Sequence, residues 1–207
     1  MDSLLDTIRD NGRQIMFVVA RGLNKITLGK LHPNVVTIIG LLAHIPIAYF
    51  IASEQLVLAA GLLVFFGLFD ALDGALAKLQ KRASSAGMVL DATTDRMKEV
   101  LLYIGAAYYF VNTGSPKFAV WAVAACGGSL LVSYVKAKGE TAVKDAGLSP
   151  NEVNKLFSDG LLRFEVRMFV LIIGLLSGYL EVAVVIIAIL AWLTTFQRLI
   201  RITKKLA

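Results

Sequence analysis

Several residue types are scarce in this sequence, and each scarcity excludes something. The 207 residues include one cysteine, two histidines and four prolines. A single cysteine, Cys126, excludes an intramolecular disulfide, and because it lies inside an apolar run we expect a small side chain of the membrane core. His44 also lies within an apolar run, and nothing pairs it with a base or nucleophile role. We expect it to pack as a neutral side chain.

Charge is scarce as well. Only 17% of the residues are charged, whereas 57% are hydrophobic. This composition is too apolar for an ordinary soluble domain and predicts an integral membrane protein in contact with the lipid bilayer. A formal net charge of +6 is compatible with nucleic-acid binding. However, no stretch resembles a nucleic-acid-binding module, so we expect no nucleic-acid partner.

Long apolar runs recur through the chain. Six of them approach the length that crosses a bilayer, some only with their flanks or a tilt; they are residues 35–52, 56–79, 89–111, 118–135, 162–178 and 182–196. Residues 2–30 mix apolar with charged side chains, which predicts an amphipathic helix lying in the membrane interface. A helix that binds a soluble partner is the alternative. We therefore predict an all-α integral membrane protein, with an interfacial amphipathic helix over residues 1–33 and one six-helix membrane domain over residues 34–207.

The basic residues are unevenly divided between the two sides that six spans create. An even number of spans puts both termini on one side, and 20 of the 21 lysines and arginines share that side. Only Lys117 falls in a loop on the other side. Because basic loops are retained in the cytoplasm, we predict that both termini are cytoplasmic.

Four aspartates lie close to the cytoplasmic ends of the second and third spans. Asp70 and Asp73 lie near the end of one apolar run, and Asp91 and Asp95 lie near the start of the next. Residues three or four apart share one face of a helix, so each pair projects from one side of its own helix, and the pairs can meet across a short turn. A carboxylate near the membrane boundary costs at least about a few kcal/mol unless it is paired or faces a wet cavity. These residues are therefore a functional-site hypothesis.

Four converging carboxylates repel one another unless cations compensate their charge. A divalent metal is the simplest compensation, since carboxylate oxygens suit magnesium or manganese, and magnesium commonly joins such side chains to substrate phosphates. The sequence therefore predicts metal-dependent phosphate chemistry at a membrane surface, with the site open to the cytoplasm.

The same residues carry a resemblance to a known family. Their spacing, D-x-x-D-G-x-x-A-K-x8-G-x3-D-x3-D, resembles the signature of the CDP-alcohol phosphotransferase family at every fixed position except Lys78, where the family usually has arginine. The resemblance implies two divalent cations, Mg²⁺ or Mn²⁺, on the pyrophosphate of a CDP-linked lipid, with Asp70, Asp73 and Asp91 as metal ligands. Asp95 would contact the second metal and act as the general base for an acceptor hydroxyl, and CMP would leave. A homodimer is also implied.

Three residues near the aspartates match family positions that contact the nucleotide. Gly74 would let the nucleotide approach the helix backbone closely, with a helix-packing glycine as the alternative. Lys78 keeps the positive charge near the pyrophosphate but lacks the planar fork of arginine, so we expect weaker or differently aimed nucleotide contact. Ser84 matches a small hydroxyl on the nucleotide, and an ordinary turn serine is the alternative.

The entry to the first span, Pro33-Asn34-Val-Val-Thr37, is similar to a family stretch that lies beside the cytidine. The resemblance therefore adds Pro33, Asn34 and Thr37 to the residues expected to bind the CDP-lipid. Helix capping alone is an alternative explanation for Asn34 and Thr37.

The second half of the chain resembles the inositol-phosphate-using branch of the family, the phosphatidylinositol phosphate and archaetidylinositol phosphate synthases. Ser133, Lys136 and Arg198 match the residues that contact the acceptor phosphate there. Lysine and arginine are the usual phosphate-binding side chains. Basic residues at span ends can also be topology anchors that extend to the headgroups, and this alternative stays open.

The resemblance implies transfer of the phosphatidyl or archaetidyl group of CDP-diacylglycerol or CDP-archaeol to myo-inositol 1-phosphate. Two alternatives stay within the family: glycerol 3-phosphate as the acceptor, as in phosphatidylglycerophosphate synthases, or a soluble CDP-alcohol as the donor. A divalent-cation transporter is an alternative from another class, but transporters often show inverted repeats or interrupted helices near the midplane, and this sequence shows neither.

Overall fold

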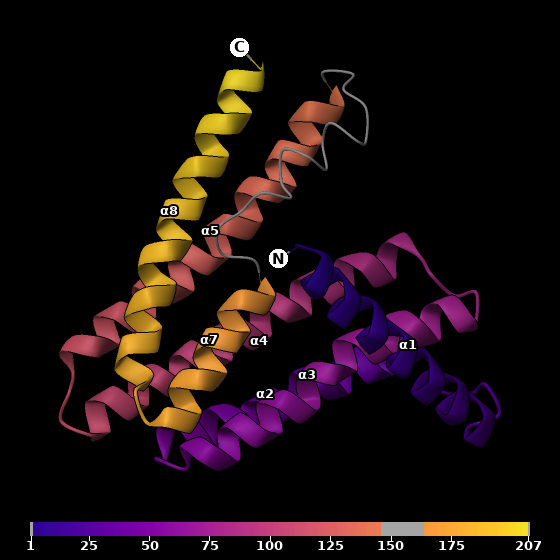
Figure 1. The fold of residues 1–207 in the computed structure, drawn as a ribbon, viewed down its shortest axis with the longest axis horizontal. Helices are drawn as coiled ribbons and strands as arrows, with labels where there is room; N and C mark the ends of the chain where they lie inside the picture. Colours follow the sequence, from indigo (N-terminus) through magenta and orange to yellow (C-terminus); the bar gives the residue numbers. More distant parts are fainter. Residues whose placement is uncertain (1, 146–163, 207) are drawn as a thin grey trace. The chain divides into compact units, whose positions relative to one another are not determined.

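The computed structural model describes residues 2–145 and 164–206, and every secondary-structure element in those two ranges is an α-helix (Figure 1). The helices are α1 (Asp2–Ile26), α2 (Pro33–Ala52), α3 (Leu56–Leu79), α4 (Ser85–Asn112), α5 (Lys117–Asp145), α7 (Phe164–Ser177) and α8 (Leu180–Leu206). The all-α class predicted from the sequence is confirmed. The start of the fifth predicted span, at residue 162, lies outside the described residues.

Four of these helices are long and apolar enough to cross a membrane: α2, α3, residues 117–142 of α5, and α8. The helix α4 has sufficient length, but Asp91, Asp95, Arg96, Lys98 and Glu99 interrupt its apolar character. The described residues of α7 number 14, fewer than the roughly 20 that cross the hydrocarbon layer. The described residues therefore contain four candidate membrane spans, and the count of six stays a prediction.

The chain forms two compact units. The first contains residues up to Tyr49 together with Gly61–Leu101, and the second contains Phe50–Ala60 and the chain from Leu102 onward. All four signature aspartates belong to the first unit.

A small hydrophobic core joins α1, α2 and α3 within the first unit. Its buried residues are Ala20, Val36, Leu72, Ala75 and Leu76, with Phe17, Leu23, Leu31 and Phe69 packed around them. The Gln80 side chain links the ends of two of these helices, because its Nε2 donates to Asn24 Oδ1 at 2.8 Å and to the Leu31 carbonyl at 2.9 Å. The apolar face of α1 is thus covered partly by protein. Its place in the membrane interface stays a prediction.

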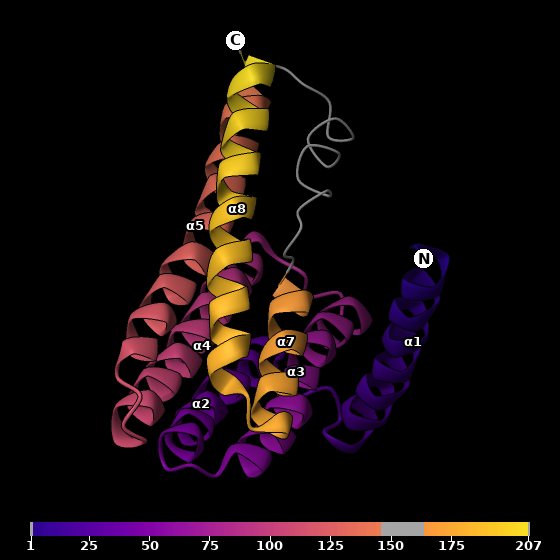
Figure 2. The ribbon, with the colours of Figure 1, turned by 60° about the vertical axis from the view of Figure 1, so that its left-hand side comes forward.

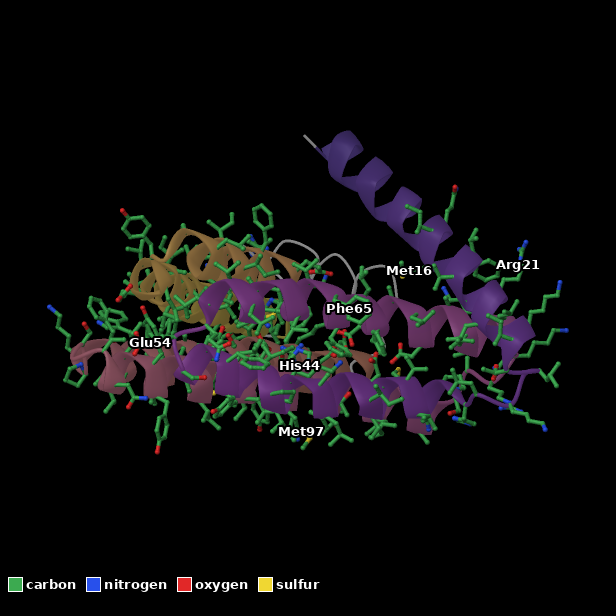
Figure 3. The ribbon with its side chains drawn as sticks, turned by 90° about the horizontal axis from the view of Figure 1, so that it is seen from below. Met16, Arg21, His44, Glu54, Phe65 and Met97 are labelled. Atoms are coloured by element: carbon green, nitrogen blue, oxygen red, sulfur yellow. The ribbon has the colours of Figure 1, made fainter. Side chains whose placement is uncertain are left out.

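Large apolar side chains lie on the outside of the first unit. Phe65 on α3 is 57% exposed and Met97 on α4 is 49% exposed, whereas His44 lies in the interior (Figure 3). An exposed apolar surface of this kind suits contact with lipid rather than water. The buried His44 ring bonds the Gly40 carbonyl through Nδ1 at 2.7 Å, which agrees with the packing role predicted for it.

In the second unit, α5 and α8 lie side by side along much of their length (Figures 1 and 2). Small residues allow this close approach: a Cβ added to Gly128 would lie 3.0 Å from the Cβ of Ala191. Next to it, the Trp192 indole Nε1 donates to the Ala124 carbonyl at 3.1 Å. The packed pair α5 and α8 carries all three residues predicted to bind the acceptor.

Candidate active site

The four aspartates are positioned by the turn that joins α3 to α4. Lys81 has a φ of 54°, in the left-handed region that ends many helices, and the Arg82 N–H donates to the Ala77 carbonyl at 2.8 Å. At the other side of the turn, the Ser84 hydroxyl accepts the Gly87 N–H at 3.1 Å and caps the start of α4. The chain therefore leaves α3 and enters α4 within a few residues, which brings the two aspartate pairs onto neighbouring helices.

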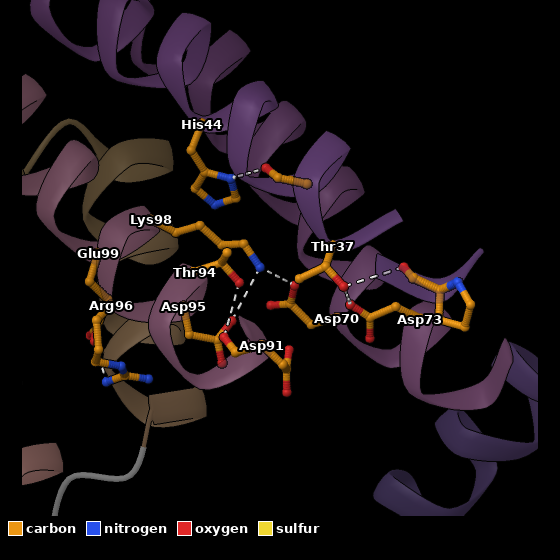
Figure 4. A network of polar contacts seen from close by, with 12 residues as sticks. Thr37, His44, Asp70, Asp73, Asp91, Thr94, Asp95, Arg96, Lys98 and Glu99 are labelled. Atoms are coloured by element: carbon orange, nitrogen blue, oxygen red, sulfur yellow. Dashed lines mark hydrogen bonds and ion pairs between the residues drawn. The ribbon is translucent and has the colours of Figure 1, made fainter. Parts of the chain in front are cut away.

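Three of the aspartates have partners within the site (Figure 4). The Thr37 hydroxyl on α2 donates to Asp73 Oδ2 at 2.5 Å, and this hydroxyl and carboxylate are both buried. The Lys98 ammonium on α4 donates to Asp70 Oδ1 and, at 3.1 Å, to Asp95 Oδ1. Helices α2, α3 and α4 thus all contribute to one polar network inside an apolar unit.

A cavity of about 250 Å³ opens beside this network. Its lining includes all six residues predicted to bind the CDP-lipid, and Asp73 and Asp91 as well; these six are Pro33, Asn34, Thr37, Gly74, Lys78 and Ser84. They come from α2, α3 and the start of α4, so only the folded unit brings them together. Two of the signature aspartates thus border the same cavity as these six residues.

The geometry around Gly74 and Asn34 bears on two alternatives from the sequence: that Gly74 is a helix-packing glycine, and that Asn34 caps a helix. A Cβ added to Gly74 would meet no heavy atom within 4 Å in the described part of the chain, so no packing contact requires a glycine there. The Asn34 N–H donates to His32 Nδ1 at 3.2 Å, which makes the His32 ring, not Asn34, the cap of α2. The Asn34 side chain instead lies close to Gly87, since a Cβ added to that glycine would be 3.6 Å from Asn34 Oδ1.

For Ser84 and Thr37, structural and site roles occur together. Ser84 caps α4 and also lines the cavity, so the turn-serine explanation holds without excluding nucleotide contact. Thr37 can donate to the Pro33 carbonyl at 3.4 Å, but its contact with Asp73 is far shorter. Thr37 therefore acts mainly on the acidic cluster, and capping does not account for it.

The residues fit a hard divalent cation by donor chemistry. Carboxylate oxygens from α3 and α4 face one polar site, and such oxygens are the ligands that magnesium and manganese prefer. A cation is already stabilised between Asp70 and Asp95, namely the Lys98 ammonium. Within residues 2–145 and 164–206, however, no three acidic, histidine or cysteine side chains converge closely enough to hold one metal ion. The carboxylates that would converge are bound by Lys98 and Thr37 instead.

The residues predicted to bind the acceptor lie in the second unit. Arg198 on α8 is buried, and its Nη1 donates to the Val132 carbonyl on α5 at 3.0 Å, beside Ser133. The Ser133 hydroxyl is partly buried and donates to the Ser129 carbonyl at 3.4 Å. Lys136 is exposed and lies 3.7 Å from Glu140 one turn later. Arg198 thus contacts the α5 backbone at the residue before Ser133, whereas Lys136 has the exposure expected of a topology anchor.

Two residues of the site were missed by the reasoning from sequence. Lys98 was counted with the basic residues that set the topology, although it lies three residues after Asp95 and so shares its helix face. Arg82 lines the cavity together with Lys78, and it too was counted only as a topology residue. The spacing from Asp95 was the signal that could have found Lys98; no spacing pointed to Arg82.

Comparison with known proteins tests the family assignment. Residues 30–197 match the family model described as CDP-alcohol phosphatidyltransferase. The chain belongs to this family. The match runs from just before α2 to Gln197 within α8 and includes every signature aspartate, so the enzyme class predicted from the Asp70–Asp95 spacing is confirmed. Together with its four apolar helices, membership makes the chain a multi-pass membrane transferase.

Curated members of the CDP-alcohol phosphatidyltransferase family resemble this chain over most of its length. The archaetidylinositol phosphate synthase of Methanothermobacter thermautotrophicus is 28% identical over 177 residues, covering 83% of each chain. The phosphatidylinositol phosphate synthase of Corynebacterium glutamicum is 31% identical over 144 residues, covering 67% of this chain and 66% of the relative. The relatives thus carry the names of the branch that the second half of the sequence resembles.

A solved structure of the family has the same fold. The phosphatidylinositol phosphate synthase of Mycobacterium tuberculosis with CDP-DAG bound aligns with a TM-score of 0.76 at 26% identity, covering 91% of this chain and 94% of that one. The same protein in complex with manganese and citrate aligns with a TM-score of 0.75. A member of the family with this fold therefore binds a CDP-lipid and a divalent metal.

Proposed function

We propose that this transferase moves the phosphatidyl or archaetidyl group of a CDP-linked lipid to myo-inositol 1-phosphate and releases CMP. The observation that carries the proposal is the cavity in the first unit, which gathers all six residues expected at the nucleotide beside Asp73 and Asp91. The names of the relatives support the choice of acceptor.

The reaction requires one proton transfer and one displacement at phosphorus. The hydroxyl of the acceptor gives its proton to the Asp95 carboxylate, and the oxygen attacks the lipid-linked phosphorus of the CDP-lipid. The bond from that phosphorus to the bridging oxygen breaks, and CMP leaves with the electron pair. Two divalent cations, when bound by Asp70, Asp73, Asp91 and Asp95, would neutralise charge on the transferred and leaving phosphates.

The remaining residues of the site orient the donor. Lys78 and Arg82 line the cavity with positive charge, which suits the pyrophosphate of the donor. Gly74 presents bare helix backbone to the cavity and leaves room for the nucleotide. Thr37 holds the Asp73 carboxylate in one orientation. We assign Asn34, Pro33 and Ser84 to the cytidine end of the same cavity.

The acceptor phosphate is assigned to Arg198 and Ser133, with Lys136 nearby on the same helix as Ser133. Arg198 on α8 bonds the α5 backbone at Val132, the residue that precedes Ser133. We therefore assign its guanidinium and the Ser133 hydroxyl to one phosphate group. The proposal further includes six spans, an interfacial α1, cytoplasmic termini and active site, and a homodimer.

Purified protein should be incubated with Mg²⁺, with CDP-diacylglycerol or CDP-archaeol, and with each acceptor in turn, while CMP and the lipid product are followed by mass spectrometry. We expect CMP only with inositol phosphate, and at least about a hundredfold less CMP from Asp95→Asn, because the general base is lost.

Other outcomes of this experiment separate the alternatives. CMP with glycerol 3-phosphate would keep the family and overturn the assignment of Ser133, Lys136 and Arg198. No CMP with either lipid donor, but CMP with a soluble CDP-alcohol, would overturn the lipid donor. Metal-dependent uptake into liposomes with no CMP release would favour the cation transporter.

A further inference from the structure

Lys98 is one of the most deeply buried side chains of the protein. It is 2% exposed, and its ammonium contacts two carboxylates. A buried ammonium is costly in a membrane protein unless it is paired, so its position requires a reason. A lysine that only set the topology would extend to the headgroups instead.

Lys98 links two helices of the acidic site. It pairs with Asp95 one turn earlier on α4 and with Asp70 on α3 (Figure 4). Helix α2 lies against it at Gly40, where an added Cβ would be in ordinary van der Waals contact with Lys98, 3.8 Å from Cε and 3.9 Å from Nζ. The three helices that form the site thus also enclose this ammonium, with the buried His44 ring on α2 facing the same region.

The two carboxylates that Lys98 holds are both among the predicted metal ligands. A divalent ion and an ammonium that share the same carboxylate oxygens lie a few ångströms apart and repel each other. The ammonium lies between Asp70 and Asp95, where a divalent ion held by both carboxylates would also lie.

We propose that Lys98 is an internal counter-ion of the metal site: it holds Asp70 and Asp95 while no metal is bound, and it competes with the divalent cation for them. Lys98 is a positioning residue in this role, and it raises the metal concentration at which the site fills. The inference rests on the metal site included in the proposed function.

The test is Mn²⁺ binding to the purified protein without substrates, measured from the electron paramagnetic resonance signal of the free ion. We expect Lys98→Met to lower the Kd for Mn²⁺ at least about tenfold, because the competing charge is gone. Lys98→Arg keeps the charge and should stay within about threefold of wild type. The matched control, Lys25→Met, removes one exposed positive charge from α1 and should leave the Kd unchanged.

A second readout is the thermal stability of the same variants. Without metal, Lys98→Met leaves the carboxylates to repel one another, so the Tm of this variant should fall below that of wild type. Saturating Mn²⁺ should raise the Tm of the variant by more than it raises the Tm of wild type. If Lys98→Met does not fold without metal, Lys98→Gln, which can still donate hydrogen bonds to both aspartates, takes its place.

The results that would overturn the proposal are distinct from those that would overturn the function. An unchanged or higher Kd in the neutral variants, with wild type binding Mn²⁺, contradicts the role of Lys98 alone. Failure of both neutral variants to fold even in saturating Mn²⁺ also contradicts it, because the metal should replace the lost charge. No Mn²⁺ binding by wild type would remove the metal site and the inference together.

Discussion

Gly74 allows a test of the nucleotide cavity that separates binding from folding. An added Cβ meets no heavy atom within 4 Å among the described residues, and alanine favours a helix by about 0.5–1 kcal/mol over glycine. We therefore expect Gly74→Ala to keep or raise the Tm in detergent. The KM for the CDP-lipid should rise roughly tenfold, corresponding to about 1.4 kcal/mol of lost binding, because the methyl group enters the space for the nucleotide.

Gly67 is a matched control on the same helix. A Cβ there also meets nothing within 4 Å of the described residues, and Gly67 does not line the cavity. Gly67→Ala should therefore leave the KM unchanged. Equal KM values for Gly74→Ala and wild type would show that the nucleotide does not approach this part of α3.

Individual residues of the site differed in how well the sequence predicted them. The aspartates were predictable because their spacing along α3 and α4 is a local property, and carboxylates near a membrane boundary require compensation. The role of Lys98 was missed because a lysine near a span end has the same sequence pattern whether it faces the headgroups or a buried carboxylate. Only the packing of α2, α3 and α4 distinguishes these two positions.

At the scale of helices, the contact of α7 with α8 depends on Gly174. A Cβ added to Gly174 would lie 2.4 Å from the Cβ of Ala183, closer than side chains can pack. We expect Gly174→Ala to lower the stability of the protein by about 1–3 kcal/mol, because the two helices must separate. Thermal unfolding in detergent measures the effect.

Gly127 on α5 provides the comparison for Gly174. An added Cβ there has open space within the described structure, so Gly127→Ala should be neutral or slightly stabilising. A Tm for Gly174→Ala equal to that of Gly127→Ala would mean that α7 can move away from α8 without cost.

Helix positions were predicted well where apolar runs and helices coincide. The predicted run 56–79 matches α3 at both ends. In contrast, α5 continues to Asp145, beyond the predicted end at residue 135, and α8 continues to Leu206, beyond residue 196. Hydropathy indicates which residues suit lipid, whereas a helix ends where its backbone hydrogen bonds end. A polar helical end therefore cannot be predicted from hydropathy.

At the scale of the whole molecule, the orientation in the membrane is open to direct measurement. Cys126 is the only cysteine, so Cys126→Ala provides a background for single cysteines introduced at Lys81 or Thr113. Both positions are exposed in turns between helices. If basic residues face the cytoplasm, a membrane-impermeant maleimide added to intact cells should label the Thr113→Cys protein and not the Lys81→Cys protein.

The reverse labelling pattern would place the acidic site on the outer face and contradict the predicted topology. Labelling of both positions in broken membranes is the control, since it shows that each cysteine is reactive. This result would decide on which side of the membrane the turn between α3 and α4, and with it the acidic site, lies.

The proposed donor-site and acceptor-site residues lie in different units, which has a consequence for how such enzymes diversify. The cavity residues and the acidic network come from two segments of the first unit, residues 33–37 and 70–98, and the proposed acceptor residues come from α5 and α8 in the second. Mutations in α5 and α8 therefore leave the aspartates and the residues of the nucleotide cavity unchanged in sequence. Gene duplication followed by drift in α5 and α8 would then be enough to produce a paralogue with a new alcohol as its substrate.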